Sequence, residues 1–161
     1  METEKTNNLI VKVENPIDKI PDFINIVFEC FNDLKIVDDT HHSHININKL
    51  LSNNINFCYI SLDDDLRTIN GYLIGEKKLL MDGRLVFFIT YIYVASVDRN
   101  KGIGTTLIEK IILKCRKTYG INYIMLMCRT ESKINNFYLK LGFVQDPIIK
   151  LKNMNVMIYF L

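Results

Sequence analysis

The sequence of 161 residues contains no tryptophan, only three prolines and little net charge. Its four cysteines, Cys30, Cys58, Cys115 and Cys128, form no C-x-x-C pair, so we expect buried free thiols in a reducing compartment. A net charge of +2 is too small to indicate a nucleic-acid-binding protein. No apolar run approaches a membrane span, and charged residues scattered through the first twenty exclude a signal peptide. These absences predict a cytoplasmic protein with no nucleic-acid or membrane partner.

The chain is long enough for one hydrophobic core. Of its residues, 48% are hydrophobic, and a chain of this size can bury a core as a single domain. No internal repeat or linker divides the sequence. The mostly polar stretch from Met1 to Asn8 predicts a mobile end. We therefore expect one domain over residues 9–161.

The most informative stretch runs from Leu85 to Tyr119. Its first part, Leu85 to Ala95, is a continuous apolar, aromatic and β-branched run, which predicts a buried strand. Apolar residues then recur at helical spacing, which predicts a helix from about Gly102 to Tyr119 that Gly120 ends. A glycine-rich turn that opens a helix presents unpaired backbone N–H groups at the positive end of the helix dipole. The sequence therefore predicts an anion site at this turn.

Two common phosphate-binding motifs do not fit the turn. A Walker A loop ends in Gly-Lys-Ser/Thr, whereas Lys101 precedes the glycines here. A dinucleotide fingerprint has a third glycine where this chain has Leu107. What remains is Arg-x-x-Gly-x-Gly, Arg99 to Gly104, followed downstream by Phe-Tyr-x-Lys-x-Gly-Phe, Phe137 to Phe143. Together the two motifs resemble those of the GCN5-related N-acetyltransferase (GNAT) superfamily.

The resemblance implies a coenzyme site at this turn. It implies acetyl-CoA as the acetyl donor and no metal. In that superfamily the strand before the turn splays from its neighbour, and the pantetheine amides pair with the strand backbone. By position, these contacts fall to Ile92, Tyr93 and Val94. The residues that would hold the pyrophosphate are Arg99, Asn100, Lys101, Gly102, Ile103, Gly104 and Thr105.

Tyr138 is the candidate catalytic residue. It occupies the tyrosine position of the downstream motif, and the resemblance implies that it acts as general acid toward the departing thiolate. A core tyrosine beside Phe137 is the alternative interpretation. The general base stays open among Tyr91, Tyr93, Glu76, Glu131, the histidines His41, His42 and His44, and a relaying water.

The remaining pattern predicts further strands and helices. Strands are expected at Leu9–Val13, Asn56–Leu62, Ile69–Lys77, Tyr123–Met127, Phe143–Ile149 and Asn155–Phe160. Helices are expected from Asn15-Pro16 to Phe31, with Pro21 near the first turn, from about Asn46 to Leu51, and from Ser132 to Leu141. Hairpins precede the turn from Arg99 to Thr105, which we call the phosphate turn, and a strand–helix–strand crossover follows it. This order predicts an α/β (α+β) fold, a mixed and mostly antiparallel sheet with helices on both faces, as in the GNAT fold.

Among possible acceptor amines, the resemblance favours glucosamine-6-phosphate. Element spacing is closest to that of the glucosamine-6-phosphate N-acetyltransferases, in which case Lys77, Lys78 and Arg84 would serve the sugar phosphate. A protein N-terminal or lysine acetyltransferase is the alternative, with Tyr91 and Tyr93 in a peptide groove. A non-catalytic acyl-CoA-binding module is a third interpretation.

Two features of the sequence have more than one interpretation. The patch of His41, His42 and His44 would face a substrate or form an exposed loop, and no carboxylate or cysteine stands at metal-ligand spacing. The apolar end from Ile158 to Leu161 is explained equally by a homodimer contact and by a core strand.

Overall fold

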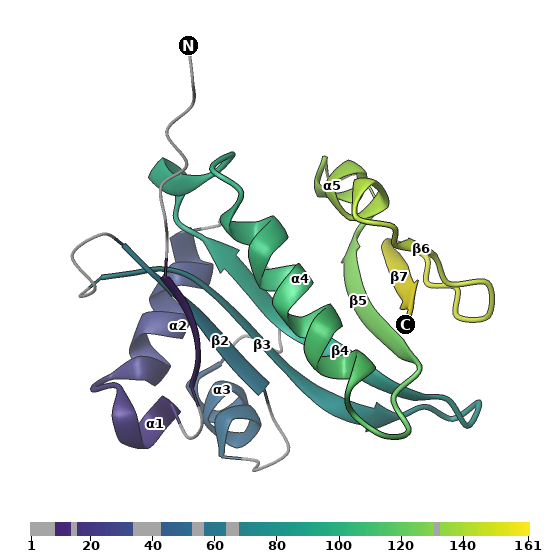
Figure 1. Cartoon of the computed structure of the whole chain (residues 1–161), viewed down its shortest axis with the longest axis horizontal. Coiled ribbons are helices and arrows are strands. Elements are labelled where there is room, and N and C mark those ends of the chain that lie inside the picture. Colours follow the sequence, from purple (N-terminus) through teal and green to yellow (C-terminus); the bar gives the residue numbers. More distant parts are fainter. Residues whose placement is uncertain (1–8, 14–15, 34–42, 53–56, 64–67, 131–132) are drawn as a thin grey trace. The chain divides into compact units, whose positions relative to one another are not determined.

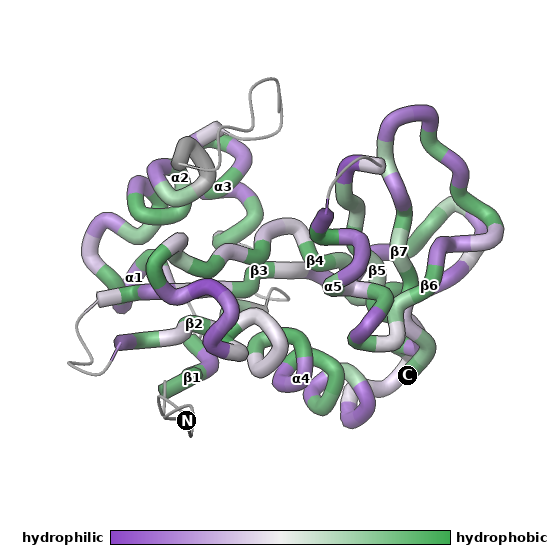
Figure 2. The backbone as a smooth tube through the Cα atoms, turned by 90° about the horizontal axis from the view of Figure 1, so that it is seen from above, coloured by the Kyte–Doolittle hydropathy of each residue, from purple (hydrophilic) through white to green (hydrophobic). Residues whose placement is uncertain are grey.

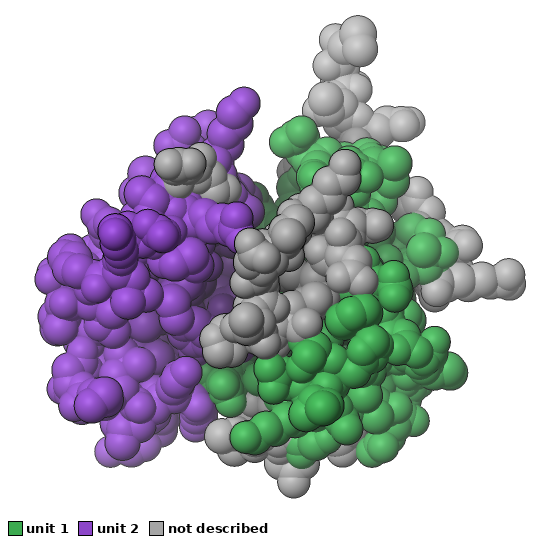
Figure 3. All heavy atoms as spheres, turned by 180° about the vertical axis from the view of Figure 1, so that it is seen from behind, with its two compact units in different colours: residues 1–76, 91–107 green, residues 77–90, 108–161 purple. Residues whose placement is uncertain are grey.

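The computed structural model describes residues 9–13, 16–33, 43–52, 57–63, 68–130 and 133–161. The expected mobile end, residues 1–8, lies outside them. The chain divides into two compact units (Figure 3), which we call unit 1 (residues 1–76 and 91–107) and unit 2 (residues 77–90 and 108–161). The expectation of a single domain stays a prediction.

The strands form a seven-stranded sheet in the order β1-β2-β3-β4-β5-β7-β6 (Figure 1). The strands are β1 (Leu9–Val13), β2 (Phe57–Leu62), β3 (Ile69–Leu79), β4 (Leu85–Val94), β5 (Tyr123–Arg129), β6 (Val144–Gln145) and β7 (Met154–Phe160). β4 and β5 pair in parallel, whereas the pairs β1–β2, β2–β3, β5–β7 and β6–β7 are antiparallel. The predicted mixed, mostly antiparallel sheet is confirmed.

Unit 1 has its core between two helices and one face of the sheet. The helices of this unit are α1 (Pro16–Lys19), α2 (Phe23–Asp33) and α3 (His44–Leu51). Figure 2 shows α2 and α3 lying together over the strands of this unit. Phe23 and Val27 from α2 join Tyr72 and Ile74 from β3 in one buried cluster. Tyr72 also donates a hydrogen bond to the Val27 carbonyl oxygen at 3.2 Å, which ties β3 to α2.

The opposite face of β3 in unit 1 meets the start of a different helix. Successive strand residues point to opposite faces, so Gly71 faces away from the cluster that contains Tyr72. A Cβ built on Gly71 would lie 3.0 Å from Cγ2 of Ile103 and 3.1 Å from the Tyr93 carbonyl oxygen. Ile103 is the first residue of α4 (Ile103–Arg116). Helices therefore cover both faces of the sheet in unit 1, as predicted, and a glycine at position 71 permits the close approach.

The first predicted helix is divided in two. We expected one helix from residue 15 to Phe31, but α1 ends at Lys19 and α2 begins at Phe23. Pro21 has no N–H to continue the ladder, and Asp22 adopts φ 60, which interrupts helical geometry. The expected cap, Asn15, lies outside the described residues. The sequence alone does not indicate this break, because a proline is also compatible with the first turn of a helix.

Unit 2 carries its own apolar cluster. Val86, Met125, Val156 and Ile158 are buried together on one side of β4, β5 and β7. Ile158 is therefore a core residue, and the homodimer contact at the chain end stays a prediction. The predicted strand from Phe143 to Ile149 is wrong beyond Gln145, because Asp146 accepts the N–H groups of Ile148 and Ile149 at 2.7 and 2.8 Å and turns the chain.

The cysteines are free thiols, as predicted. Cys58, Cys115 and Cys128 are buried and Cys30 is half-buried. Burial raises the pKa of Cys58 and of Cys115 to about 12, so both thiols stay protonated and unreactive at neutral pH. Among the helices that are described, none is both long and apolar enough to cross a bilayer.

Candidate active site

The phosphate turn of unit 1 is built from backbone conformations that few residues adopt. A short 3-10 helix, Ser96–Asp98, follows β4 and leads into Asn100 at φ 64 and Gly102 at φ 85. The Gly102 carbonyl oxygen accepts the Thr106 N–H at 3.0 Å and the Thr106 hydroxyl at 3.1 Å. Gly102 is thus the residue that caps α4, and the predicted helix start is confirmed to within one residue.

The first turn of α4 presents donors without helical acceptors. The N–H groups of Ile103, Gly104 and Thr105 precede the first i to i−4 bond of the helix, so no helical carbonyl is available to them. A Cβ on Gly102 would meet nothing within 4 Å, so the cap is open on its outer side. An anion at this position would find backbone donors and the positive end of the dipole of a 14-residue helix.

The two cationic side chains of the turn, Arg99 and Lys101, already contact oxygen atoms of the protein. Arg99 donates through Nε to the Val94 carbonyl oxygen at 3.1 Å, and its side chain is exposed. Lys101 forms an ion pair with Asp98, Nζ to Oδ1 2.8 Å, with 45% of the lysine side chain exposed. A bound pyrophosphate would compete with Asp98 for Lys101. Asp98 was not singled out from the sequence.

The strand before the turn is paired with β5 over only part of its length. The parallel register joins Val86, Phe87 and Phe88 to Tyr123, Ile124 and Met125, whereas β4 continues to Val94. Within β4, Tyr93 is buried, and its ring stacks on Tyr72 at 5.4 Å, whereas Ile92 and Val94 are half-buried. Tyr91 is 5% and Tyr93 8% exposed. Both side chains belong to the core of unit 1, which argues against the expected tyrosine-lined peptide groove.

Tyr138 lies on α5 (Ile134–Lys140) in unit 2 and is 3% exposed. Its ring packs edge-on against Phe137 at 5.2 Å and Phe143 at 5.8 Å. Burial, and secondarily the charge that Cys128 would carry, raise the pKa of Tyr138 well above its usual range. The phenol therefore stays protonated across neutral pH, the form that an acid or a hydrogen-bond donor requires.

A polar network that no local sequence pattern indicates holds the start of α5. Asn135 accepts hydrogen bonds through Oδ1 from the Cys128 thiol at 2.8 Å and from Asn155 Nδ2 at 3.0 Å. Its own Nδ2 donates to the carbonyl oxygens of Arg129 and Thr130, each at 3.0 Å. The partners come from two separate stretches of sequence, residues 128–130 and Asn155, so no local motif signals them.

Arg84 is engaged in a structural ion pair. Its guanidinium contacts Asp146 at 2.6 Å and Asp82 at 2.7 Å, and the Asp146 side chain is fully buried. Lys78 lies over the Phe88 ring, with Nζ 5.1 Å from the centroid. Of the three cations expected to bind a sugar phosphate, Arg84 therefore already forms ion pairs with two carboxylates of unit 2.

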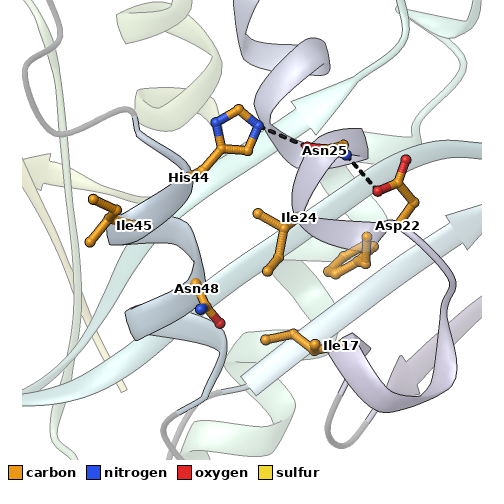
Figure 4. Close-up of a pocket in the computed structure, with 8 residues that line it drawn as sticks. Ile17, Asp22, Ile24, Asn25, His44, Ile45 and Asn48 are labelled. Carbon is orange, nitrogen blue, oxygen red and sulfur yellow. Dashed lines mark hydrogen bonds between the residues drawn. The ribbon is translucent and has the colours of Figure 1, made fainter.

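His44 is the only one of the three predicted histidines among the described residues. It lines a pocket of about 400 Å³ with Asp22 and Asn25 (Figure 4). Its Nε2 lies 2.8 Å from Asn25 Oδ1, and Asn25 Nδ2 donates to Asp22 Oδ1 at 2.5 Å. The ring also stacks on Phe28 at 4.0 Å. His44 thus ties α3 to α2. No group of three metal-ligating side chains occurs within the described ranges.

Comparison with known proteins agrees with the fold. The acetyltransferase (GNAT) domain model matches residues 55–145, more than half of the chain, and the chain belongs to this family of acetyltransferases. Among curated proteins, none matches the sequence.

Several solved structures share the fold. NAA60 of Arabidopsis thaliana in complex with a bisubstrate analogue is 11% identical, with a TM-score of 0.72 over 94% of this chain and 98% of that one. The NatC complex bound to Gag peptide and CoA gives 21% identity and a TM-score of 0.70 over 94% and 98%. A glucosamine N-acetyltransferase region of a fungal multi-domain β-N-acetylglucosaminidase gives 17% and 0.70, over 88% of this chain and 17% of that one.

Proposed function

We propose that this GNAT-family protein transfers the acetyl group of acetyl-CoA to a primary amine. The observation that supports the proposal most is the phosphate turn, where Gly102 leaves the N-terminus of α4 open and three backbone donors have no helical acceptor. The coenzyme pyrophosphate binds to the turn from Arg99 to Thr105. The pantetheine amides pair with the backbone of Ile92 to Val94, the part of β4 that continues beyond its pairing with β5.

The chemistry needs few groups. The neutral amine attacks the thioester carbonyl carbon, the C–N bond forms and the C–S bond breaks, and the sulfur leaves as a thiolate that needs a hydrogen-bond donor or a proton. We assign this donor to Tyr138, whose buried phenol remains protonated at neutral pH. The amine proton leaves to a base or to water.

Among acceptors, we favour a peptide N-terminus, which would be held by residues other than Tyr91 and Tyr93, because both of these side chains are buried in the core of unit 1. Arg84 is held by Asp82 and Asp146, which removes one of the three cations that would recognise a sugar phosphate. The likeness to the NatC complex bound to Gag peptide and CoA, over 94% of this chain and 98% of that one, supports the same choice. An amino sugar is the second candidate, because the fungal glucosamine N-acetyltransferase region shares the fold.

The test is release of free thiol from acetyl-CoA in the presence of three acceptor panels: peptides with free N-termini, glucosamine with its 6-phosphate, and polyamines. We expect turnover on peptides. Turnover on the phosphorylated sugar alone would assign the acceptor site to amino sugars and make Lys77 and Lys78 the next residues to substitute. Tight binding of acetyl-CoA with no thiol release from any panel would show a binding module.

A further inference from the structure

The short helix α5 needs an anchor at its first turn. It has only seven residues, and its N-cap, Lys133, makes no side-chain hydrogen bond to the helix. Isolated helices of this length are not stable in water, so packing and side-chain contacts must position α5. Its C-terminal end is capped, because the Tyr138 carbonyl oxygen accepts hydrogen bonds from the N–H groups of Leu141 and Phe143, each at 3.1 Å.

Asn135 supplies the missing anchor at the other end. It is the second residue of α5, and its amide makes four hydrogen bonds: two accepted from Cys128 and Asn155, and two donated to the carbonyl oxygens of Arg129 and Thr130. These partners belong to the end of β5, the residue that follows it, and β7. Cys128 and Asn155 are also direct register partners in the β5–β7 ladder. Asn135 therefore fixes α5 to two adjacent strands at a single point.

Tyr138 stands three residues after Asn135, on the same face of the helix. We propose that Asn135, with Cys128 and Asn155, is a positioning residue for Tyr138 in acetyl transfer. We call these three residues the Asn135 clamp. The inference rests on the proposed function, since it assumes that Tyr138 acts on the thioester. Displacement of a reacting group by about 1 Å can cost up to 100-fold in rate, so a device that fixes the helix carrying Tyr138 would act on turnover.

Asn135→Ala removes all four hydrogen bonds, and Asn136→Ala is the matched control. Asn136 is an exposed asparagine in the same turn. We expect kcat to fall about 10-fold in Asn135→Ala with the KM for acetyl-CoA little changed, and no change in Asn136→Ala. Cys128→Ser, which keeps a donor toward Asn135, should retain more activity than Cys128→Ala.

Two further measurements separate positioning from general stability. In a Tyr138→Phe background, Asn135→Ala should have little further effect on kcat, because the clamp acts through the phenol. Tyrosine ring carbons labelled with 13C report the position of Tyr138 directly, since ring currents from Phe137 and Phe143 depend on geometry. The Tyr138 signal is assigned by its loss in Tyr138→Phe, and it should shift in Asn135→Ala.

The outcomes distinguish the two proposals. A shifted Tyr138 signal with a lower kcat supports both. A shifted signal with wild-type turnover in Tyr138→Phe would leave the clamp as a structural device and overturn both the catalytic role of Tyr138 and the positioning role built on it. An unshifted signal, or a loss in kcat that is the same with and without the Tyr138 hydroxyl, would overturn the positioning role alone.

Discussion

The phosphate turn of unit 1 and the first turn of α5 in unit 2 are built in opposite ways. The phosphate turn consists of consecutive residues, is largely exposed, and offers backbone groups shaped by positive φ angles at Asn100 and Gly102. The start of α5 depends on Cys128, Asn135 and Asn155, which are separated by 7 and 20 positions and joined by side-chain hydrogen bonds. An anion site can thus be encoded locally, whereas the placement of Tyr138 depends on contacts between distant parts of the sequence.

The largest expected effect comes from a charge at the phosphate turn. Gly102→Asp places a carboxylate beside the proposed pyrophosphate, in a backbone conformation that side chains disfavour. Two like charges about 4 Å apart repel by roughly 4 kcal/mol near a protein surface, so affinity for acetyl-CoA should fall about 1000-fold by calorimetry.

Gly83→Asp is the matched control for this change. Gly83 also has positive φ, and a Cβ there would also meet nothing within 4 Å, but it stands in the β3–β4 turn. Its affinity for acetyl-CoA should equal that of the wild type. Equal affinities in both variants would remove the coenzyme from the phosphate turn.

Next in size is the ion pair of unit 2. Arg84→Gln leaves the fully buried Asp146 carboxylate without its cation, which should lower the free energy of unfolding by about 3 kcal/mol in denaturant titration. Asp82→Asn removes only the outer partner and should have a much smaller effect. Equal effects of the two changes would contradict the buried pair as the stabilising contact.

The same pair predicts a dependence of stability on pH. Burial raises the pKa of Asp146, but hydrogen bonds from Arg84, Ile149 and Ile148 outweigh it and hold this pKa below its usual value. A carboxyl with a lowered pKa stabilises the fold above its unfolded pKa of about 4, and this contribution is lost as pH falls through the folded pKa. The stability difference between wild type and Arg84→Gln should therefore be complete at neutral pH, begin to shrink where Asp146 protonates in the folded variant, and vanish as pH falls through the lowered pKa of Asp146 in the wild type.

Tyr138→Phe tests the chemistry of unit 2 with a smaller expected effect. Loss of the phenol should lower kcat about 100-fold and leave the affinity for acetyl-CoA unchanged, as expected for a donor used in the transition state. Tyr119→Phe, at a fully exposed tyrosine, should behave as wild type. Steady-state kinetics with the best peptide acceptor measures both. Undiminished turnover in Tyr138→Phe would identify Tyr138 as a core residue only.

Local signals in the sequence were sufficient for much of this fold. The β4 strand from Leu85 to Val94 and the end of α5 before Gly142 were predicted because apolar runs and glycines act within a few residues. The expected end of the other long helix at about Tyr119 is wrong, since α4 ends at Arg116. Gly102, Gly120 and Gly142 all have positive φ. Three features were not predicted for one shared reason. The turn at Asp146, the commitment of Arg84 and the Asn135 clamp each depend on partners that are distant in sequence or on a hydrogen-bond geometry that composition does not fix.

The smallest predicted effects compare three glycines with positive φ. Alanine at such a position costs about 1 kcal/mol in backbone strain. At Gly102 a Cβ meets nothing within 4 Å, and at Gly120 it makes an ordinary contact with Leu85 at 3.4 Å, so both changes should lower unfolding free energy by about that strain alone.

At Gly142, which ends α5, a Cβ would lie 3.2 Å from the Tyr159 ring. That ring has little freedom to withdraw, because Phe143 packs against it at 5.3 Å and Arg116 donates to its hydroxyl at 3.1 Å. Gly142→Ala should therefore cost about 2 kcal/mol, roughly twice the strain alone, in thermal or denaturant unfolding. Equal stability of all three alanine variants would mean that the Tyr159 ring moves aside without cost. The end of α5 would then be a local turn, like the phosphate turn, and contacts with residues distant in sequence would not hold it.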